Sequence, residues 1–75
     1  MKTLKNCKVG QFTELVGLDK LAPLKIRRRL CDLGFTPGQR VKLVRKSVLG
    51  KALLIEIRGY TLSIRSTVAE AVLVK

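Results

Sequence analysis

The residues that could do chemistry are few in this chain, and they lie apart in the sequence. There is no histidine, and the five acidic residues form no evident pair for general acid–base catalysis. No serine or cysteine has a plausible base near it in the sequence, and no glycine-rich phosphate-binding loop is present. We therefore predict that the chain is not an enzyme and that it should not bind or hydrolyse GTP.

The two cysteines, Cys7 and Cys31, are the strongest metal-ligand candidates, but their spacing matches no metal-binding pattern. Iron(II) and zinc sites use histidine, cysteine or clustered carboxylates. Cys31 and Asp32 are adjacent, and adjacent residues of a helix point in different directions. We therefore expect two free structural thiols in a reducing compartment, with no resident metal and no cofactor.

The positive charge is the clearest global feature. Sixteen basic residues against five acidic ones give a net charge of +11, which favours an anionic partner: nucleic acid, an acidic protein face or anionic lipid. The charge alone does not choose among these partners. Much of it is spread along predicted strands, as outward, solvated positions would be: Lys42, Arg45, Lys46, Lys51, Arg58 and Arg65.

The basic run Arg27-Arg28-Arg29 lies in a predicted helix that has sequence signals for its start and its end. Pro23 suits the first helical position, because its missing N–H would have no partner there. Gly34 suits the residue after the helix, where φ is positive. The pattern therefore predicts a helix over Pro23–Leu33, followed by a type II turn at Pro37-Gly38.

This helix has two faces that differ in kind. At about 100° per residue, one face carries a core stripe: Ala22, Ile26, Leu30 and Leu33. Leu24 and Cys31 fall nearly opposite, flanked by Arg27 and Arg28, although single apolar residues on a surface are common. We predict a partner-binding face there, with a second exposed apolar feature at the hairpin tip, Val48 and Leu49.

Alternating apolar and polar residues predict short strands on both sides of the helix. Leu53, Ile55 and Ile57 should face one side of the sheet and Glu56 and Arg58 the other, and Leu62 and Ile64 should repeat this pattern with Tyr60. Residues 1–8 either pair as an edge or fray, and Ser66–Glu70 forms one helical turn capped by Ser66. The predicted strands are Val9–Val16, Arg40–Ser47, Ala52–Arg58, Tyr60–Arg65 and Val72–Val74.

These elements predict a single domain over residues 1–75 of mainly β class. Five short strands cannot form a stable open sheet in so short a chain, and curling into a small barrel buries one face of each strand. We expect a small SH3-like five-stranded barrel, with one short α-helix inserted between the first and second strands and packed across one opening. Phe12 and Phe35 should belong to its core.

The run from Arg28 to Gly38 resembles the helix–turn signature of the FeoA family, ferrous iron transport protein A. Leu62–Arg65, Ala69 and Val72–Val74 are similar to the closing segment of that family, and Val48 stands where its hairpin tip often has proline. The resemblance implies a cytosolic SH3-like domain that supports a membrane ferrous iron transporter with a GTP-binding domain, the FeoB type. The SH3-like domain of this family is also similar to the C-terminal domain of iron-dependent repressors.

The resulting hypothesis is a small cytosolic, non-enzymatic adaptor that docks on the FeoB-type transporter and supports iron(II) uptake. The chain has no apolar run of about 18 residues and no apolar signal-peptide centre. We therefore expect the protein to reach the inner face of the cell membrane through this partner. Self-association of the protein would agree with this hypothesis. The alternative is a basic nucleic-acid-binding barrel presenting Arg27, Arg28 and Arg29. Its weakness is the scarcity of aromatic residues for stacking on bases.

Overall fold

A computed structural model describes residues 2–75. Within these residues, five strands and two α-helices follow a short 3₁₀ helix. In order, the elements are η1 (Leu4–Asn6), β1 (Phe12–Leu18), α1 (Leu24–Asp32), β2 (Arg40–Lys46), β3 (Ala52–Ile57), β4 (Tyr60–Arg65), α2 (Ser66–Ala69) and β5 (Val72–Val74).

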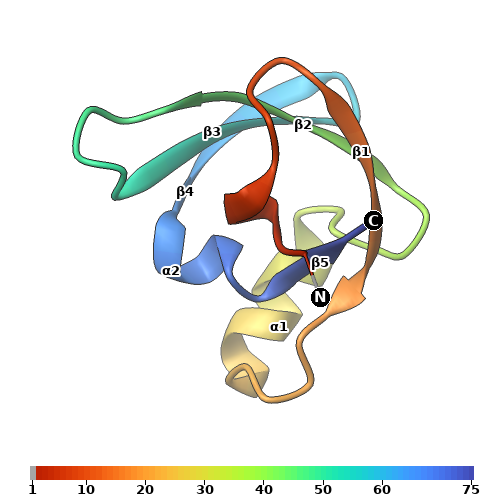
Figure 1. Cartoon of the computed structure of the whole chain (residues 1–75). Helices are drawn as coiled ribbons and strands as arrows, with labels where there is room; N and C mark the ends of the chain where they lie inside the picture. Colours follow the sequence, from red (N-terminus) through yellow and green to blue (C-terminus); the bar gives the residue numbers. More distant parts are fainter. Residues whose placement is uncertain (1) are drawn as a thin grey trace.

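All five strands belong to one sheet in the order β4-β3-β2-β1-β5, and every neighbouring pair is antiparallel. Irregularities in pairing occur between Leu15 and Gly17 in β1 and between Leu43 and Arg45 in β2. Such bulges bend and twist a strand, and Figure 1 shows strands β1 to β4 arched over η1 and α2, with β5 and α1 below. The predicted fold class, mainly β with α1 inserted between β1 and β2, is confirmed.

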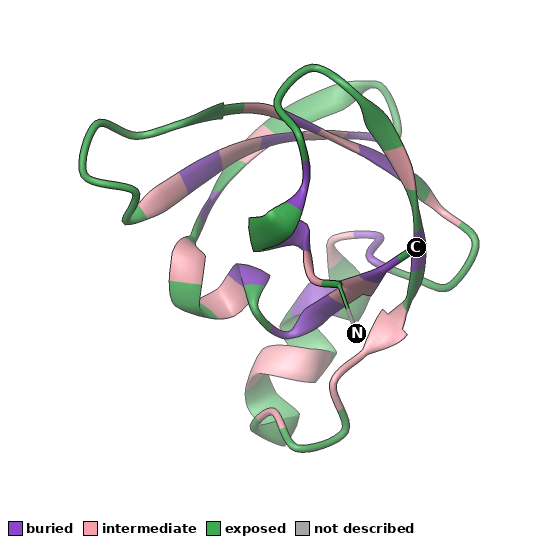
Figure 2. Cartoon of the chain, in the orientation of Figure 1, coloured by how far each residue is buried: buried purple, intermediate pink, exposed green. Residues whose placement is uncertain are grey.

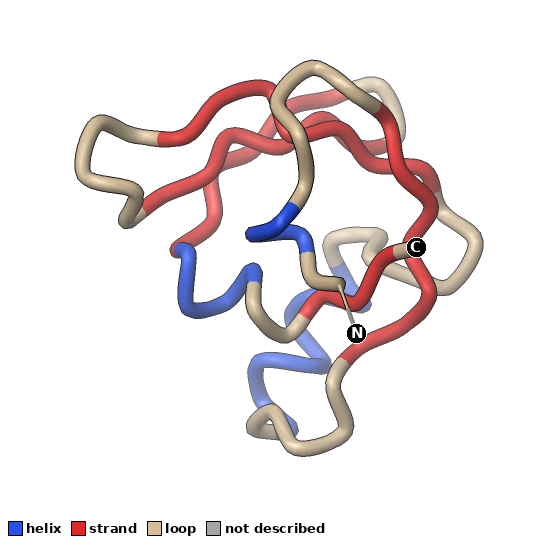
Figure 3. The backbone as a smooth tube through the Cα atoms, in the orientation of Figure 1, coloured by secondary structure: helices blue, strands red, loops and turns tan. Residues whose placement is uncertain are grey.

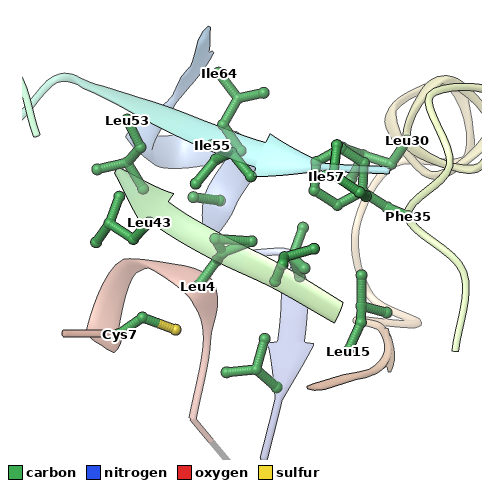
Figure 4. Close-up of a cluster of buried hydrophobic side chains, with 14 of the residues drawn as sticks. Leu4, Cys7, Leu15, Leu30, Phe35, Leu43, Leu53, Ile55, Ile57 and Ile64 are labelled. Carbon is green, nitrogen blue, oxygen red and sulfur yellow. The ribbon is translucent and has the colours of Figure 1, made fainter. Parts of the chain in front are cut away.

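One apolar core fills the inside of the curled sheet (Figure 4). Strand β3 supplies Leu53, Ile55 and Ile57, all buried, which confirms the predicted alternation. Helix α1 contributes buried Leu30, and the rest of the predicted stripe packs partly buried against the core. In Figure 2, buried positions recur along the strands, whereas the connection between β2 and β3 is exposed. The remaining fully buried large side chains are Leu4, Leu15, Phe35, Val41, Leu43, Val72 and Val74.

Phe12 is a correction, because its side chain is 45% exposed rather than in the core. It lies on the outer face of the sheet, opposite Lys42. The side-chain charges of Arg40 and Lys42 stand 5.0 and 5.1 Å from its ring centre, within cation–π range. Phe12 shares its face of β1 with Glu14 and Val16, which are also exposed, whereas Leu15 on the other face is buried.

The first residues of the chain differ from the predicted start of the first strand. Strand β1 starts at Phe12 rather than Val9, because Gly10 adopts φ +87° in a turn and donates its N–H to the Leu43 carbonyl at 2.8 Å. Residues before it do not fray: Thr3 forms an isolated bridge with Leu73, and Leu4 is fully buried. Of the two options open for residues 1–8, pairing at an edge is therefore the one observed among residues 2–8.

Two helix starts also differ by one residue from expectation. Pro23 occupies the N-cap, so α1 begins at Leu24. Arg65 occupies the N-cap of α2, where no side chain caps the helix, and Ser66 is its first helical residue rather than its cap. No helix among residues 2–75 is long and apolar enough to cross a membrane.

Candidate partner-binding site

An open groove runs along the outer face of α1 and has a volume of about 480 Å³. Its walls come from α1, the end of β1 and the turn after α1. The residues that line it are Leu18, Leu24, Arg27, Arg28, Cys31, Asp32, Phe35 and Pro37. The groove thus gathers the four helix residues predicted to bind a partner: Leu24, Arg27, Arg28 and Cys31.

Helical spacing places these side chains in one row. Leu24, Arg28 and Cys31 follow at intervals of four and three residues, which share a helix face. Leu24 is 52% exposed and Cys31 is exposed, so the prediction that they face solvent is confirmed. Arg27 is held in place, because its Nε donates a hydrogen bond to the Ala22 carbonyl at 3.0 Å.

The turn after α1 builds the floor of the groove. Gly34 has φ +99°, as predicted. Its N–H donates to the Cys31 carbonyl at 3.0 Å, and the Phe35 N–H donates to the Leu30 carbonyl at 2.9 Å. This is the Schellman pair of hydrogen bonds, and it turns the chain so that Phe35, which is fully buried, lies beneath the groove.

The next turn completes the wall. Gln39 donates its N–H to the Thr36 carbonyl at 3.1 Å, and Gly38 has φ +88°. These features match the predicted type II turn with Pro37 and Gly38 at its centre. Gly38 also donates to the Leu15 carbonyl at 2.8 Å, which ties this turn to β1 and fixes Pro37 beside the groove.

The chemistry available in the groove is recognition of an apolar group with polar neighbours. Its apolar residues meet two arginines, one exposed thiol and one carboxylate. Within residues 2–75, no three His, Cys, Asp or Glu side chains are grouped to hold a metal ion. The other cysteine, Cys7, is buried elsewhere in the core, and burial raises the pKa of its thiol, an effect that the charges of Lys2 and Lys46 partly oppose.

Val48 and Leu49 lie at a different part of the molecule. They sit at the turn between β2 and β3, which projects from the sheet on the side away from α1 (Figures 1 and 3). Val48 is fully exposed and Leu49 is 77% exposed, so their predicted exposure is confirmed. The structure therefore divides the six predicted binding residues into a groove of four and a hairpin tip of two.

Sequence reasoning missed Leu18, Asp32, Phe35 and Pro37 as groove residues. Leu18 ends β1, and only the fold brings this strand end beside α1. A usable signal for Pro37 was its place three residues after Gly34, the helix stop. No sequence signal marked Leu18.

The family model described as the FeoA domain matches residues 2–75. The chain belongs to the FeoA family. No protein of curated function matches its sequence.

Solved structures of FeoA proteins are similar to the whole chain. The FeoA of Stenotrophomonas maltophilia, crystallised with zinc and described as a procaryotic SH3 domain protein, is 28% identical, with a TM-score of 0.89 over 100% of this chain and 91% of that one. The FeoA protein of Chlorobium tepidum is 32% identical, with a TM-score of 0.86 over 97% of this chain and 68% of that one. These likenesses confirm the SH3-like fold.

A manganese-dependent transcriptional repressor shares the fold alone. It is 19% identical, with a TM-score of 0.87 over 99% of this chain but only 35% of the repressor. The sequence predicted similarity to the C-terminal domain of iron-dependent repressors; the match found is to a manganese-dependent repressor, and it shows a shared fold.

Proposed function

We propose that this FeoA-family protein is a small cytosolic, non-enzymatic adaptor that docks on the cytosolic part of a FeoB-type ferrous iron transporter and supports iron(II) uptake. The observation that carries the proposal is the α1 groove, in which a half-exposed leucine stands beside two arginines over a buried phenylalanine. A role in activating ferrous iron transport has been suggested for the Stenotrophomonas relative. The family membership supplies the transport context, and the groove supplies the means of docking.

Docking through the groove would use its apolar and basic parts differently. Leu24 offers apolar surface whose burial is worth about 1.5–3 kcal/mol, enough for one residue to dominate an interface. Arg28 is exposed at the rim, where a charge mainly guides encounter with an acidic partner. Val48 and Leu49 form the second contact of the proposed complex, which holds the protein at the inner face of the membrane.

The test is a titration of the purified protein with purified FeoB-type transporter in neutral detergent. Leu24→Glu should weaken binding by about tenfold or more without changing the melting temperature. The matched control is Leu21→Glu, because Leu21 is 92% exposed and lies outside the groove. Arg28→Ala should weaken binding less, and mainly at low salt.

Equal binding by Leu24→Glu and Leu21→Glu would contradict the groove as the docking site. A loss of folding in Leu24→Glu would show that Leu24 belongs to the core. If Leu24→Glu and Leu21→Glu both bind the transporter strongly while Arg28→Ala does not bind, the contact between the two proteins is electrostatic.

The alternative function, nucleic-acid binding, is favoured by one feature: exposed Phe12 with Arg40 and Lys42 over its ring. Two carboxylates occupy the same face of the sheet, however. Lys42 pairs with Glu56 at 3.7 Å and Lys75 with Glu14 at 3.3 Å, so part of this positive charge is already neutralised. This alternative would be favoured if single-stranded oligonucleotide displaced the protein from the transporter at low salt. The oligonucleotide should then dissociate from the protein steeply as the salt concentration rises.

A further inference from the structure

The tip of the β2–β3 hairpin presents two aliphatic side chains on a closed turn. Gly50 donates its N–H to the Ser47 carbonyl at 2.9 Å, so Val48 and Leu49 are the central residues of that turn. Ser47 also exchanges hydrogen bonds with Ala52, through its N–H to the Ala52 carbonyl at 2.9 Å and through its Oγ from the Ala52 N–H at 3.1 Å. These bonds hold the two apolar side chains at the outermost end of the hairpin.

Cations surround this tip, and no acidic residue is near it in the chain. Arg45 and Lys46 precede the turn and Lys51 follows it, while residues 33–55 contain no aspartate or glutamate. Arg65 stands opposite Ala52, beside the base of the turn. Within residues 2–75, none of these four cations takes part in an ion pair.

The order of apolar and basic residues matches the layers of a lipid surface. Lys46 and Lys51 each lie two residues behind the apolar pair, which is about 6–7 Å along a strand. Apolar groups of interfacial proteins reach about 5–10 Å into the boundary between headgroups and acyl chains. Apolar side chains at that depth would leave the lysines level with the phosphates of anionic lipids.

We propose that Val48 and Leu49 insert into the surface of an anionic lipid bilayer while Arg45, Lys46, Lys51 and Arg65 bind its phosphates. This refines the second contact of the proposed function: the tip meets the lipid around the transporter rather than the transporter itself. The lipid contact can be measured without any transporter, so its failure and that of groove docking are distinguishable.

The shape and chemistry of the tip favour lipid over other anionic partners. A projecting aliphatic turn needs a pocket in a rigid protein, whereas a fluid bilayer closes around it. Proteins bind single-stranded nucleic acid by stacking aromatic side chains on its bases, but residues 45–52 contain no aromatic side chain. Free phosphate would engage the cations and leave the apolar pair without a role.

The experiment measures flotation of the purified full chain with vesicles of phosphatidylcholine alone or with about one third phosphatidylglycerol, the anionic component. The protein should float only with the anionic vesicles. The double variant Val48→Ser, Leu49→Ser should bind them about tenfold less tightly, and Leu21→Ser, which removes another exposed leucine, should bind like the unchanged protein.

A second pair of variants separates local charge from total charge. Lys46→Gln with Lys51→Gln should weaken binding more than Lys20→Gln with Lys25→Gln, although each pair lowers the net charge from +11 to +9 because two positive charges are removed. Equal losses from both pairs, or serine variants that float normally, would overturn the proposal. So would absence of flotation, or tip variants that lose single-stranded oligonucleotide binding instead.

A fluorescence measurement keeps the proposal testable if the double serine variant fails to fold. The chain contains no tryptophan, so Leu49→Trp introduces a single reporter at the tip, and Leu21→Trp is its control. Anionic vesicles should shift the emission of Leu49→Trp to the blue, and a quencher attached near the headgroups should reduce it. An unchanged spectrum, or equal shifts in both variants, would overturn insertion.

Discussion

The α1 groove and the β2–β3 hairpin tip both expose leucine beside arginine or lysine, but they are built in opposite ways. In the groove, Leu24 stands over buried Phe35, and the Schellman bonds around Gly34 fix the floor. At the tip, Val48 and Leu49 project on a four-residue turn with solvent around them.

The same pairing of leucine with basic side chains therefore suits two kinds of partner. A concave surface with a rigid floor selects a side chain by shape, as protein interfaces do around their central residues. A projecting turn with surrounding cations selects by depth and charge, which suits a deformable anionic surface.

The largest expected effect separates the floor of the groove from its rim. Phe35→Ala should lower the free energy of unfolding by about 3–5 kcal/mol, a large share of the stability of a small domain. Leu24→Ala should change it by no more than about 0.5 kcal/mol, as should Leu49→Ala. Chemical denaturation of the three variants measures this. Similar losses for Phe35→Ala and Leu24→Ala would mean that the groove has no distinct floor.

An intermediate effect compares the glycines of the two turns. Gly34 and Gly50 both have positive φ, so alanine at either position costs about 1–2 kcal/mol in backbone strain. A Cβ at Gly34 would also lie 2.8 Å from Cδ of Arg58, whereas a Cβ at Gly50 meets nothing within 4 Å. Gly34→Ala should therefore shift the urea midpoint further. Equal shifts would show that the Arg58 side chain moves aside at little cost.

The smallest effect concerns the two thiols. Iodoacetamide should modify exposed Cys31 in the groove and leave buried Cys7 unmodified until the protein unfolds, as mass spectrometry would show.

Because burial raises the pKa of Cys7 above its ordinary value of 9.0, its contribution to stability is present below pH 9.0 and is lost as pH rises through the folded pKa.

The pH dependence has its own control. Between pH 8 and 10, Cys31→Ser should keep the decrease in melting temperature caused by Cys7, whereas Cys7→Ala should be less stable overall but show a shallower decrease. Identical pH slopes in both variants would contradict the raised pKa of Cys7.

Features that depend on neighbouring residues were predicted from the sequence. Gly34 ends α1 with positive φ, and β3 alternates as expected, because capping and pleating are local. Features that depend on distant partners were not. Phe12 was assigned to the core because its contacts with Arg40 and Lys42 come from another strand, and the burial of Leu4 depends on packing beneath the sheet.

The sequence by itself determined the mainly β class, the position of α1 and the exposure of Leu24, Cys31, Val48 and Leu49, since periodicity and turn residues specify these within a few positions. Only the tertiary structure decided that the first two share a groove with Leu18 and Phe35, while the last two stand apart on the hairpin. The physical reason is that a residue's own face follows from the 3.6- or 2-residue period. Which faces meet depends on how the bulged sheet curls around one core.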